Sequence, residues 1–173
     1  RIADVVSITM PWEVFGPSFS NWIGNPFTKR RGYAHLLHNA GYIVNLGIPG
    51  GINSQDKAFT TMAANLANTG STDYLTHLGV AQEIASWLGN DLIYLRLGYA
   101  ANHNYPWSMY YLGDATSGNL ADYATYYARM AQIYKSVLPG AKVVWNLFVE
   151  QNGTIKPGLY WPNNAIAGSV DVV

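Results

Sequence analysis

Carboxylates that follow apolar, strand-like runs are the residues with the clearest potential for chemistry. Glu13 comes three residues after the run 2–10, and Glu150 comes directly after the run 142–149. In parallel α/β folds the loops at the carboxyl ends of the strands build the site, where two carboxyl groups can share acid, base or nucleophile roles. Glu13 and Glu150 are therefore candidate catalytic residues, with ordinary loop charges as the alternative interpretation.

The segment 91–111 holds the densest set of side chains suited to ligand binding. An apolar run with one charge, Arg96, passes directly into a loop rich in amide, imidazole and aromatic groups, which would make a poor core but a good cleft lining. The candidate binding residues of this segment are Arg96, Tyr99, Asn102, His103, Tyr105 and Trp107. Three further candidates, near other predicted strand ends, are Trp12, Trp145 and Asn146.

The elements that must position these residues alternate along the chain. Apolar runs predict strands at 2–10, 42–48, 91–97, 142–149 and 167–173, and helical periodicity predicts helices at 28–40, 59–66, 72–88 and 119–137. The predicted apolar sides of these helices include Leu36 on 28–40, Leu75 on 72–88, and Tyr123, Tyr127, Met130 and Tyr134 on 119–137. Alternation of this kind predicts an α/β fold, with a parallel sheet covered by helices. A doubly wound sheet and part of a (β/α)8 barrel both agree with it. Ser71 or Thr72 is the predicted N-cap of the helix 72–88, and Gly89 its end.

The length decides how much of a barrel the chain can form. A closed (β/α)8 barrel takes roughly 250 residues, whereas this sequence has 173 residues. We therefore expect 1–173 to be a single, incomplete barrel domain. Such a domain would expose sheet edges unless self-association or further chain segments cover them.

The composition excludes several classes of function. A formal net charge of +0, with basic residues scattered apart from Lys29, Arg30 and Arg31, argues against nucleic-acid binding. No apolar run approaches the roughly 18 residues of a membrane span. Only 12% charged residues, with six Trp and thirteen Tyr, favour a secreted or cell-surface protein.

No metal or cofactor is predicted. There are no cysteines, and His35 and His38, three apart on a predicted helix, have no third His or carboxylate close in sequence, so two surface imidazoles are favoured. The loop Pro49-Gly50-Gly51 follows a strand but matches neither GxGxxG nor GxxxxGK[ST].

The segment from Arg96 to Trp107 resembles a motif of the (β/α)8 glycoside hydrolase clan that contains the family 26 β-mannanases. The stretches IADVVSITMPW, YIVNLGIPGG, PGAKVVWN and SVDVV are similar to the neighbouring strands of such barrels. The resemblance implies about barrel strands two to six and an endo-β-mannanase-like activity on a β-linked polysaccharide. Arg96, Asn102 and Trp107 match the motif's arginine, asparagine and aromatic wall.

The same resemblance identifies a departure from the mechanism. Retaining enzymes of this clan use two carboxyl groups about 5 Å apart, and the acid/base glutamate would stand where this chain has Ala100. A methyl group cannot protonate a leaving group. The aromatic candidates would stack on the apolar C–H faces of pyranose rings, with ordinary core or rim packing as the alternative for each.

Three hypotheses remain open at this point. The first is a glycoside hydrolase-like enzyme with its cleft at the strand carboxyl ends. The second is a non-catalytic descendant that binds glycan or serves in structure or assembly, which Ala100 and His103, in place of the motif's glycine, favour. The third is a doubly wound α/β binding domain, against which the missing phosphate loop argues.

Overall fold

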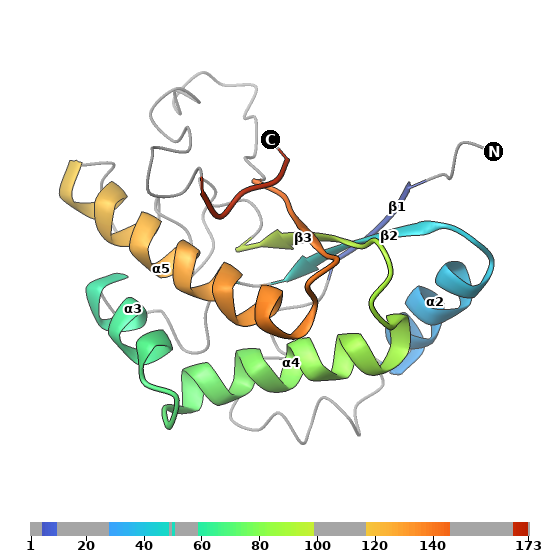
Figure 1. Cartoon of the computed structure of the whole chain (residues 1–173), viewed down its shortest axis with the longest axis horizontal. Helices are drawn as coiled ribbons and strands as arrows, with labels where there is room; N and C mark the ends of the chain where they lie inside the picture. Colours follow the sequence, from blue (N-terminus) through green and yellow to red (C-terminus); the bar gives the residue numbers. More distant parts are fainter. Residues whose placement is uncertain are drawn as a thin grey trace.

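The chain folds into a parallel α/β sheet flanked by helices. The computed structural model describes residues 5–9, 28–48, 50, 59–98, 117–145 and 168–172. Their elements are, in order, β1 (Val5–Thr9), α2 (Thr28–Asn39), β2 (Ile43–Ile48), α3 (Phe59–Ala67), α4 (Thr72–Leu88), β3 (Tyr94–Leu97), α5 (Ser117–Val137) and β4 (Lys142–Val143). All neighbouring strands pair in parallel (Figure 1). The predicted fold class is confirmed.

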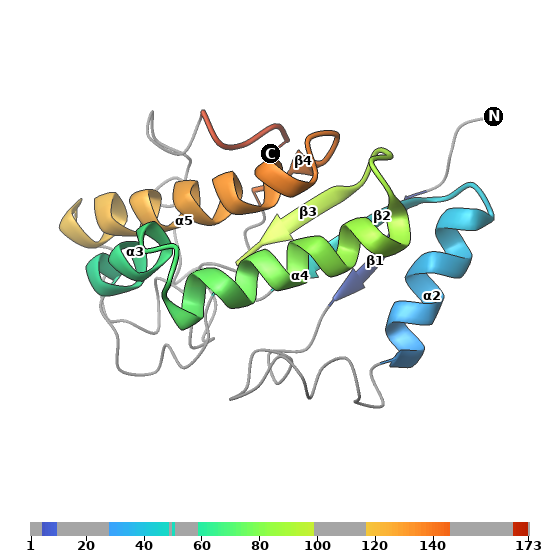
Figure 2. The same cartoon turned by 60° about the horizontal axis from the view of Figure 1, so that its bottom comes forward.

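The strand order is sequential, β1-β2-β3-β4. Because crossovers between parallel strands are right-handed, a sequential order places the connecting helices on one face of the sheet. Figures 1 and 2 show α2, α4 and α5 on the same side. A doubly wound sheet instead reverses its strand order and is covered on both faces. The described strands contain no such reversal, and their arrangement is consistent with part of a (β/α)8 barrel.

Helix α4 shows how local signals fix an element. Its N-cap is Ser71, whose side chain accepts a hydrogen bond from the Tyr74 N–H at 3.1 Å, and Gly89 ends it at φ 63°. Both caps and both ends agree with the sequence prediction. Its buried side carries His77, Ala81, Ile84 and Leu88, spaced four, three and four residues apart. Leu75, predicted to belong to the apolar side, lies off this line and is 54% exposed.

Helix α5 contributes an aromatic side to the core. Tyr123, Tyr127, Met130 and Tyr134 are buried, as the sequence predicts, and Tyr126 is buried as well. The buried side is wider than predicted because α5 packs against α3 as well as against α4 and β3. On helix α2 a predicted core residue is exposed instead. Leu36, predicted to face the core, is 64% exposed, whereas Ala34 is buried.

The end of the described chain returns to the sheet beside β4. Val144 and Val172 form an isolated parallel bridge, where the sequence predicts a fifth strand. The Asp171 carboxylate accepts a hydrogen bond from the Val143 N–H at 2.9 Å and lies 2.7 Å from Lys135 Nζ. A side chain therefore completes part of the pairing at this edge. The predicted strand 142–149 is described as far as residue 145, and β4 covers its first two residues.

Candidate functional site

Two of the predicted site residues, Arg96 and Trp145, lie in the part of the chain that the structure describes. The remaining candidates lie outside the described residues: Glu13, Glu150, Ala100, Tyr99, Asn102, His103, Tyr105, Trp107, Trp12 and Asn146. The geometry of the site is therefore built from the strands, the helix α5 and the glycines at the strand ends.

The sheet has one face packed on helices and one face that we call the open face. Side chains alternate along a strand, and Val44, Leu46, Leu95 and Leu97 are buried in the core with the helices. Among the described strand residues that alternate with these and whose burial is known, Gly47 alone is buried, and it has no side chain. The side chains of the open face are those of Val5, Ser7, Ile43, Asn45, Tyr94, Arg96, Lys142 and Val144.

A polar row crosses the open face. The strand register aligns Ser7 with Asn45, Asn45 with Tyr94, and Tyr94 with Lys142. Directly opposed residues of neighbouring strands have their Cβ atoms close enough for the side chains to interact. The middle of this face therefore offers hydroxyl, amide and ammonium groups in place of the apolar side chains that a packed core would use.

Arg96 lies one step nearer the carboxyl ends than this row. Its Nε donates to Asn45 Oδ1 at 3.1 Å, and its Nη2 lies 3.5 Å from the Ile8 carbonyl oxygen, at the long limit for a hydrogen bond. The register partner of Arg96 on β2 is Gly47, which has no side chain to obstruct the guanidinium. Arg96 can therefore cross β2 and place a fixed positive charge over three strands.

The carboxyl ends of β2 and β3 approach one another through glycines. The Gly98 N–H donates to the Ile48 carbonyl at 2.8 Å, and Gly98 has a φ of 53°, in the left-handed region that favours glycine. A Cβ at Gly98 would lie 3.3 Å from Tyr123 Oη and 3.8 Å from Gly50 Cα. The Tyr123 hydroxyl therefore lies directly against the backbone at the carboxyl end of β3.

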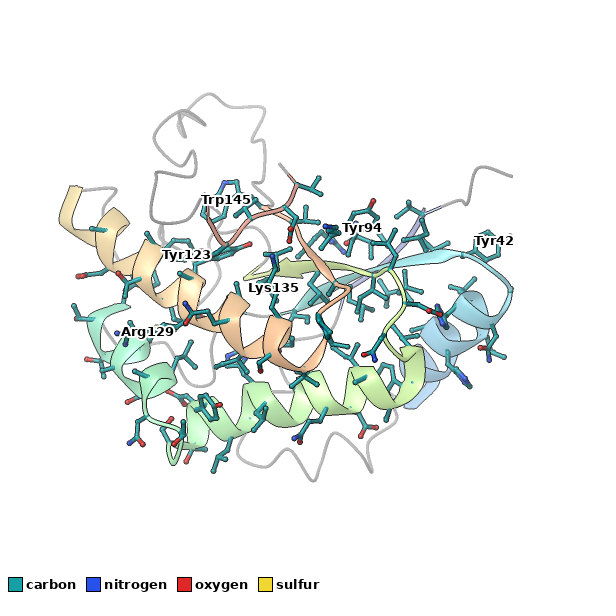
Figure 3. The ribbon with its side chains drawn as sticks, viewed as in Figure 1. Tyr42, Tyr94, Tyr123, Arg129, Lys135 and Trp145 are labelled. Atoms are coloured by element: carbon teal, nitrogen blue, oxygen red, sulfur yellow. The ribbon has the colours of Figure 1, made fainter. Side chains whose placement is uncertain are left out.

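Trp145 and Tyr123 stand together on the carboxyl side of β4 and β3 (Figure 3). Their rings meet edge to face, with centroids 5.9 Å apart, and Trp145 meets Tyr127 in the same way at 4.9 Å. Trp145 is 4% exposed, so it offers little ring surface to solvent for stacking. Tyr123 Oη and Trp145 Nε1 are both buried, and neither has a hydrogen-bond partner among the described residues.

Tyr123 was not among the predicted site residues. Its spacing on α5 is that of a core residue, and its neighbours Tyr127 and Tyr134 have the same residue type and the same burial. What distinguishes Tyr123 is the absence of a described partner for its hydroxyl, since Tyr127 Oη donates to the Val144 carbonyl and Tyr134 Oη meets His77 Nδ1. No pattern in the sequence separates these cases.

His77 connects the helices to the residue that follows the β2 strand end. Its Nδ1 lies 3.2 Å from Tyr134 Oη, and the ring also hydrogen bonds to the backbone of Gly50. Desolvation by burial lowers the pKa of His77 from 6.5 to about 4, against the opposing effects of the Asp73 charge and the Gly50 bond. A neutral imidazole thus holds α4, α5 and Gly50 together, where the sequence indicates no role for His77.

The two helical histidines, His35 and His38, have different neighbours. His35 Nε2 lies 3.0 Å from Asn39 Nδ2, whereas His38 Nε2 lies 3.1 Å from the carboxylate of Asp91, which is distant in sequence. Within the described ranges no three His, Asp or Glu residues gather into a group that could hold a metal ion. Nor is any described helix long and apolar enough to cross a membrane.

Comparisons with protein-family models, with curated proteins and with solved structures give no match. The function therefore has to be inferred from the fold, the residues at the strand ends and the sequence resemblance.

Proposed function

We propose that this protein is glycoside hydrolase-like and binds a β-linked, mannan-like polysaccharide at the carboxyl ends of its parallel strands. The observation that carries the proposal is the Arg96–Asn45 pair on the open face, held at 3.1 Å. In parallel barrels, ligand-binding groups gather at this end of the strands. A secreted or cell-surface location would suit such a ligand.

The chemistry of this pair suits sugar hydroxyl groups. A guanidinium presents several N–H donors in a fixed plane, and an amide offers both a donor and an acceptor. Hydrogen bonds that involve a charged group are among the stronger ones. The polar row of Ser7, Asn45 and Tyr94 extends this lining below Arg96. A net charge of +0 is compatible with a neutral ligand.

Binding without hydrolysis is the form of the proposal that Ala100 favours. Ala100 stands at the position of the family's acid/base glutamate, so this residue supplies no proton. The alternative is a hydrolase that uses Glu13 or Glu150. The two forms differ in one measurable respect, which is the release of reducing sugar.

The test measures binding and hydrolysis on the same samples. Calorimetry with soluble mannan, β-glucan and xylan should show binding, with mannan strongest, and a reducing-sugar assay should show no release. Arg96→Lys keeps the charge but loses the planar fork, and we expect it to weaken binding roughly tenfold, the loss of one charge-assisted hydrogen bond.

Arg129→Lys is the matched control. Arg129 is on α5, where its Nη1 donates to the Ala63 carbonyl in α3, away from the open face. It should bind as the wild type does. Release of reducing sugar that stops in Glu150→Gln or Glu13→Gln would establish the hydrolase alternative. Folded wild-type protein that binds none of the three glycans would overturn the proposal.

A further inference from the structure

We infer that the Tyr123 hydroxyl and the Trp145 indole N–H bind neutral oxygen acceptors, hydroxyl groups of a bound glycan or enclosed water, at the carboxyl ends of β3 and β4. The glycan source rests on the proposed function. These two donors would select ligands by the positions of their hydroxyl groups. The sequence, in contrast, predicts stacking for Trp145 and core packing for Tyr123.

Both donors, the Tyr123 hydroxyl and the Trp145 indole N–H, are buried without an acceptor among the described residues. Tyr123 is 0% exposed and Trp145 is 4% exposed, and neither Oη nor Nε1 has a partner in the described residues. Native proteins satisfy the large majority of buried polar side-chain atoms, and a buried donor that lacks an acceptor is costly. Two such donors on side chains whose rings touch are therefore an unusual local arrangement.

Two other buried tyrosines of α5 provide a comparison for Tyr123. Tyr127 Oη donates to the Val144 carbonyl at 3.2 Å, and Tyr134 Oη lies 3.2 Å from His77 Nδ1. These hydroxyl groups hold α5 to β4 and to α4. Tyr123 lies one turn before Tyr127, and its hydroxyl instead faces Gly98 at the end of β3. Its donor is thus directed toward the strand ends, where the ligand is proposed to bind.

The surroundings of the Tyr123 hydroxyl favour a neutral acceptor. Burial alone raises the pKa of the Tyr123 phenol, which keeps the hydroxyl protonated and able to donate. Among its ring neighbours, Phe59 at 4.9 Å and Trp145 at 5.9 Å meet it edge to face, and the rings of Tyr126 and Tyr127 lie tilted to it at 5.9 Å and 6.2 Å. None of these ring neighbours carries a charge, so an ionic ligand would have to be desolvated among them without a counter-charge from them. A neutral hydroxyl oxygen avoids that cost.

Both donors lie close to the carboxyl ends of the strands. A Cβ built on Gly98 would lie 3.3 Å from the Tyr123 hydroxyl and 3.8 Å from Gly50 Cα, so two glycines without side chains lie near this hydroxyl on the strand side. Because both donors are enclosed, a glycan hydroxyl would have to displace the atoms that cover them. Binding should therefore change the environment of Trp145 and with it the fluorescence of the protein.

The experiment uses tyrosine-to-phenylalanine variants of the whole chain, each tested for thermal stability and for mannan affinity. If Tyr123 donates to the glycan, Tyr123→Phe leaves the Tm unchanged or higher but weakens binding about tenfold, and Trp145→Phe weakens it similarly. Tyr127→Phe loses an internal hydrogen bond, so its Tm should fall by about 2–4 °C with affinity retained. Tyr126→Phe is the control, because its hydroxyl makes a long contact with Met130 Sδ, at 3.9 Å, and neither quantity should change.

The other outcomes separate the two sources and the two proposals. If the acceptor is water, Tyr123→Phe lowers the Tm as Tyr127→Phe does, with affinity retained, and a crystal structure shows water within hydrogen-bond distance of Oη. Unchanged Tm together with unchanged affinity, or a crystal structure in which Oη donates to a protein atom, overturns the inference. Wild-type protein that binds no glycan overturns the proposed function and removes the glycan source, leaving the water outcome to be decided by Tm and crystallography.

Discussion

Acidification should destabilise this protein through His77, and the loss of stability should begin at a higher pH than the protonation of ordinary carboxylates. His77 is 2% exposed, and burial lowers its pKa to about 4 from 6.5. Between these two pH values the unfolded chain binds a proton at His77 that the folded chain does not bind. The free energy of unfolding is therefore fully retained above about pH 6.5 and falls as the pH approaches 4.

The size of the loss follows from the two pKa values. Each pKa unit corresponds to roughly 1.4 kcal/mol, so the interval from 6.5 to about 4 corresponds to about 3 kcal/mol. Below about pH 4 this group adds nothing further. The charge of Asp73 acts to raise the pKa of His77, and the Tyr134 hydroxyl lies within hydrogen-bond distance of its ring.

Urea unfolding at pH 7, 6, 5 and 4, followed by circular dichroism, measures this loss. His77→Gln keeps hydrogen-bonding groups near Tyr134 and Gly50 but has no ionisable group, so its stability should change little over this range whatever its value at pH 7. His35→Gln removes an exposed imidazole and is the matched control, expected to follow the wild-type profile. If His77→Gln loses as much stability between pH 7 and pH 4 as the wild type does, the reasoning is refuted.

Two further substitutions test single contacts. Gly98→Ala should lower the free energy of unfolding by about 1–2 kcal/mol, because an L side chain at a φ of 53° is strained and its Cβ would lie 3.3 Å from Tyr123 Oη; in a Tyr123→Phe background the penalty should shrink, and an equal penalty in both backgrounds would contradict the contact. Asp171→Asn should cost about 0.5–1 kcal/mol and make the remaining stability less dependent on salt, measured by urea unfolding at low and high NaCl. Desolvation acts to raise the pKa of Asp171, but the hydrogen bonds from Lys135 and the Val143 N–H hold it below 3.8. The stability that Asp171 contributes is therefore present above pH 3.8 and lost as the pH falls through its folded-state pKa. If Asp171→Asn loses as much stability as the wild type does when the pH falls below 3.8, the ion pair of Asp171 with Lys135 is contradicted.

Elements with local signals could be predicted from the sequence. The ends of α4 follow from Ser71 and Gly89, because a cap depends on residues within one helical turn. The apolar sides of helices were harder to predict. Leu36 and Leu75 have the residue type of a core position but are exposed, because the direction from which a helix is covered depends on elements distant in sequence.

The candidate site depends on contacts that no local pattern contains. Arg96 meets Asn45 across 51 residues, and only the parallel register of β2 and β3 brings Gly47 beneath the guanidinium. His77 and Tyr134 are 57 residues apart. The sequence indicated the end of the sheet where a ligand would bind, through Arg96, but it could not indicate which buried groups would face that end.

The sequential strand order distinguishes this sheet from a doubly wound one in the kind of cleft that it can form. In a doubly wound sheet the cleft forms where the strand order reverses, between two strands whose connections leave in opposite directions. The described strands β1 to β4 show no reversal, so they offer no cleft of that kind. Their helices cover one face, and the polar groups of Asn45 and Arg96 lie on the other, toward the carboxyl ends. A ligand that contacts those groups would therefore lie on the open face near the strand ends, and the Tyr123 hydroxyl meets Gly98 at the same end. Two independent features, one from each face of the sheet, converge on the same end, and a mannan-binding assay of Arg96→Lys and Tyr123→Phe tests whether they serve one ligand.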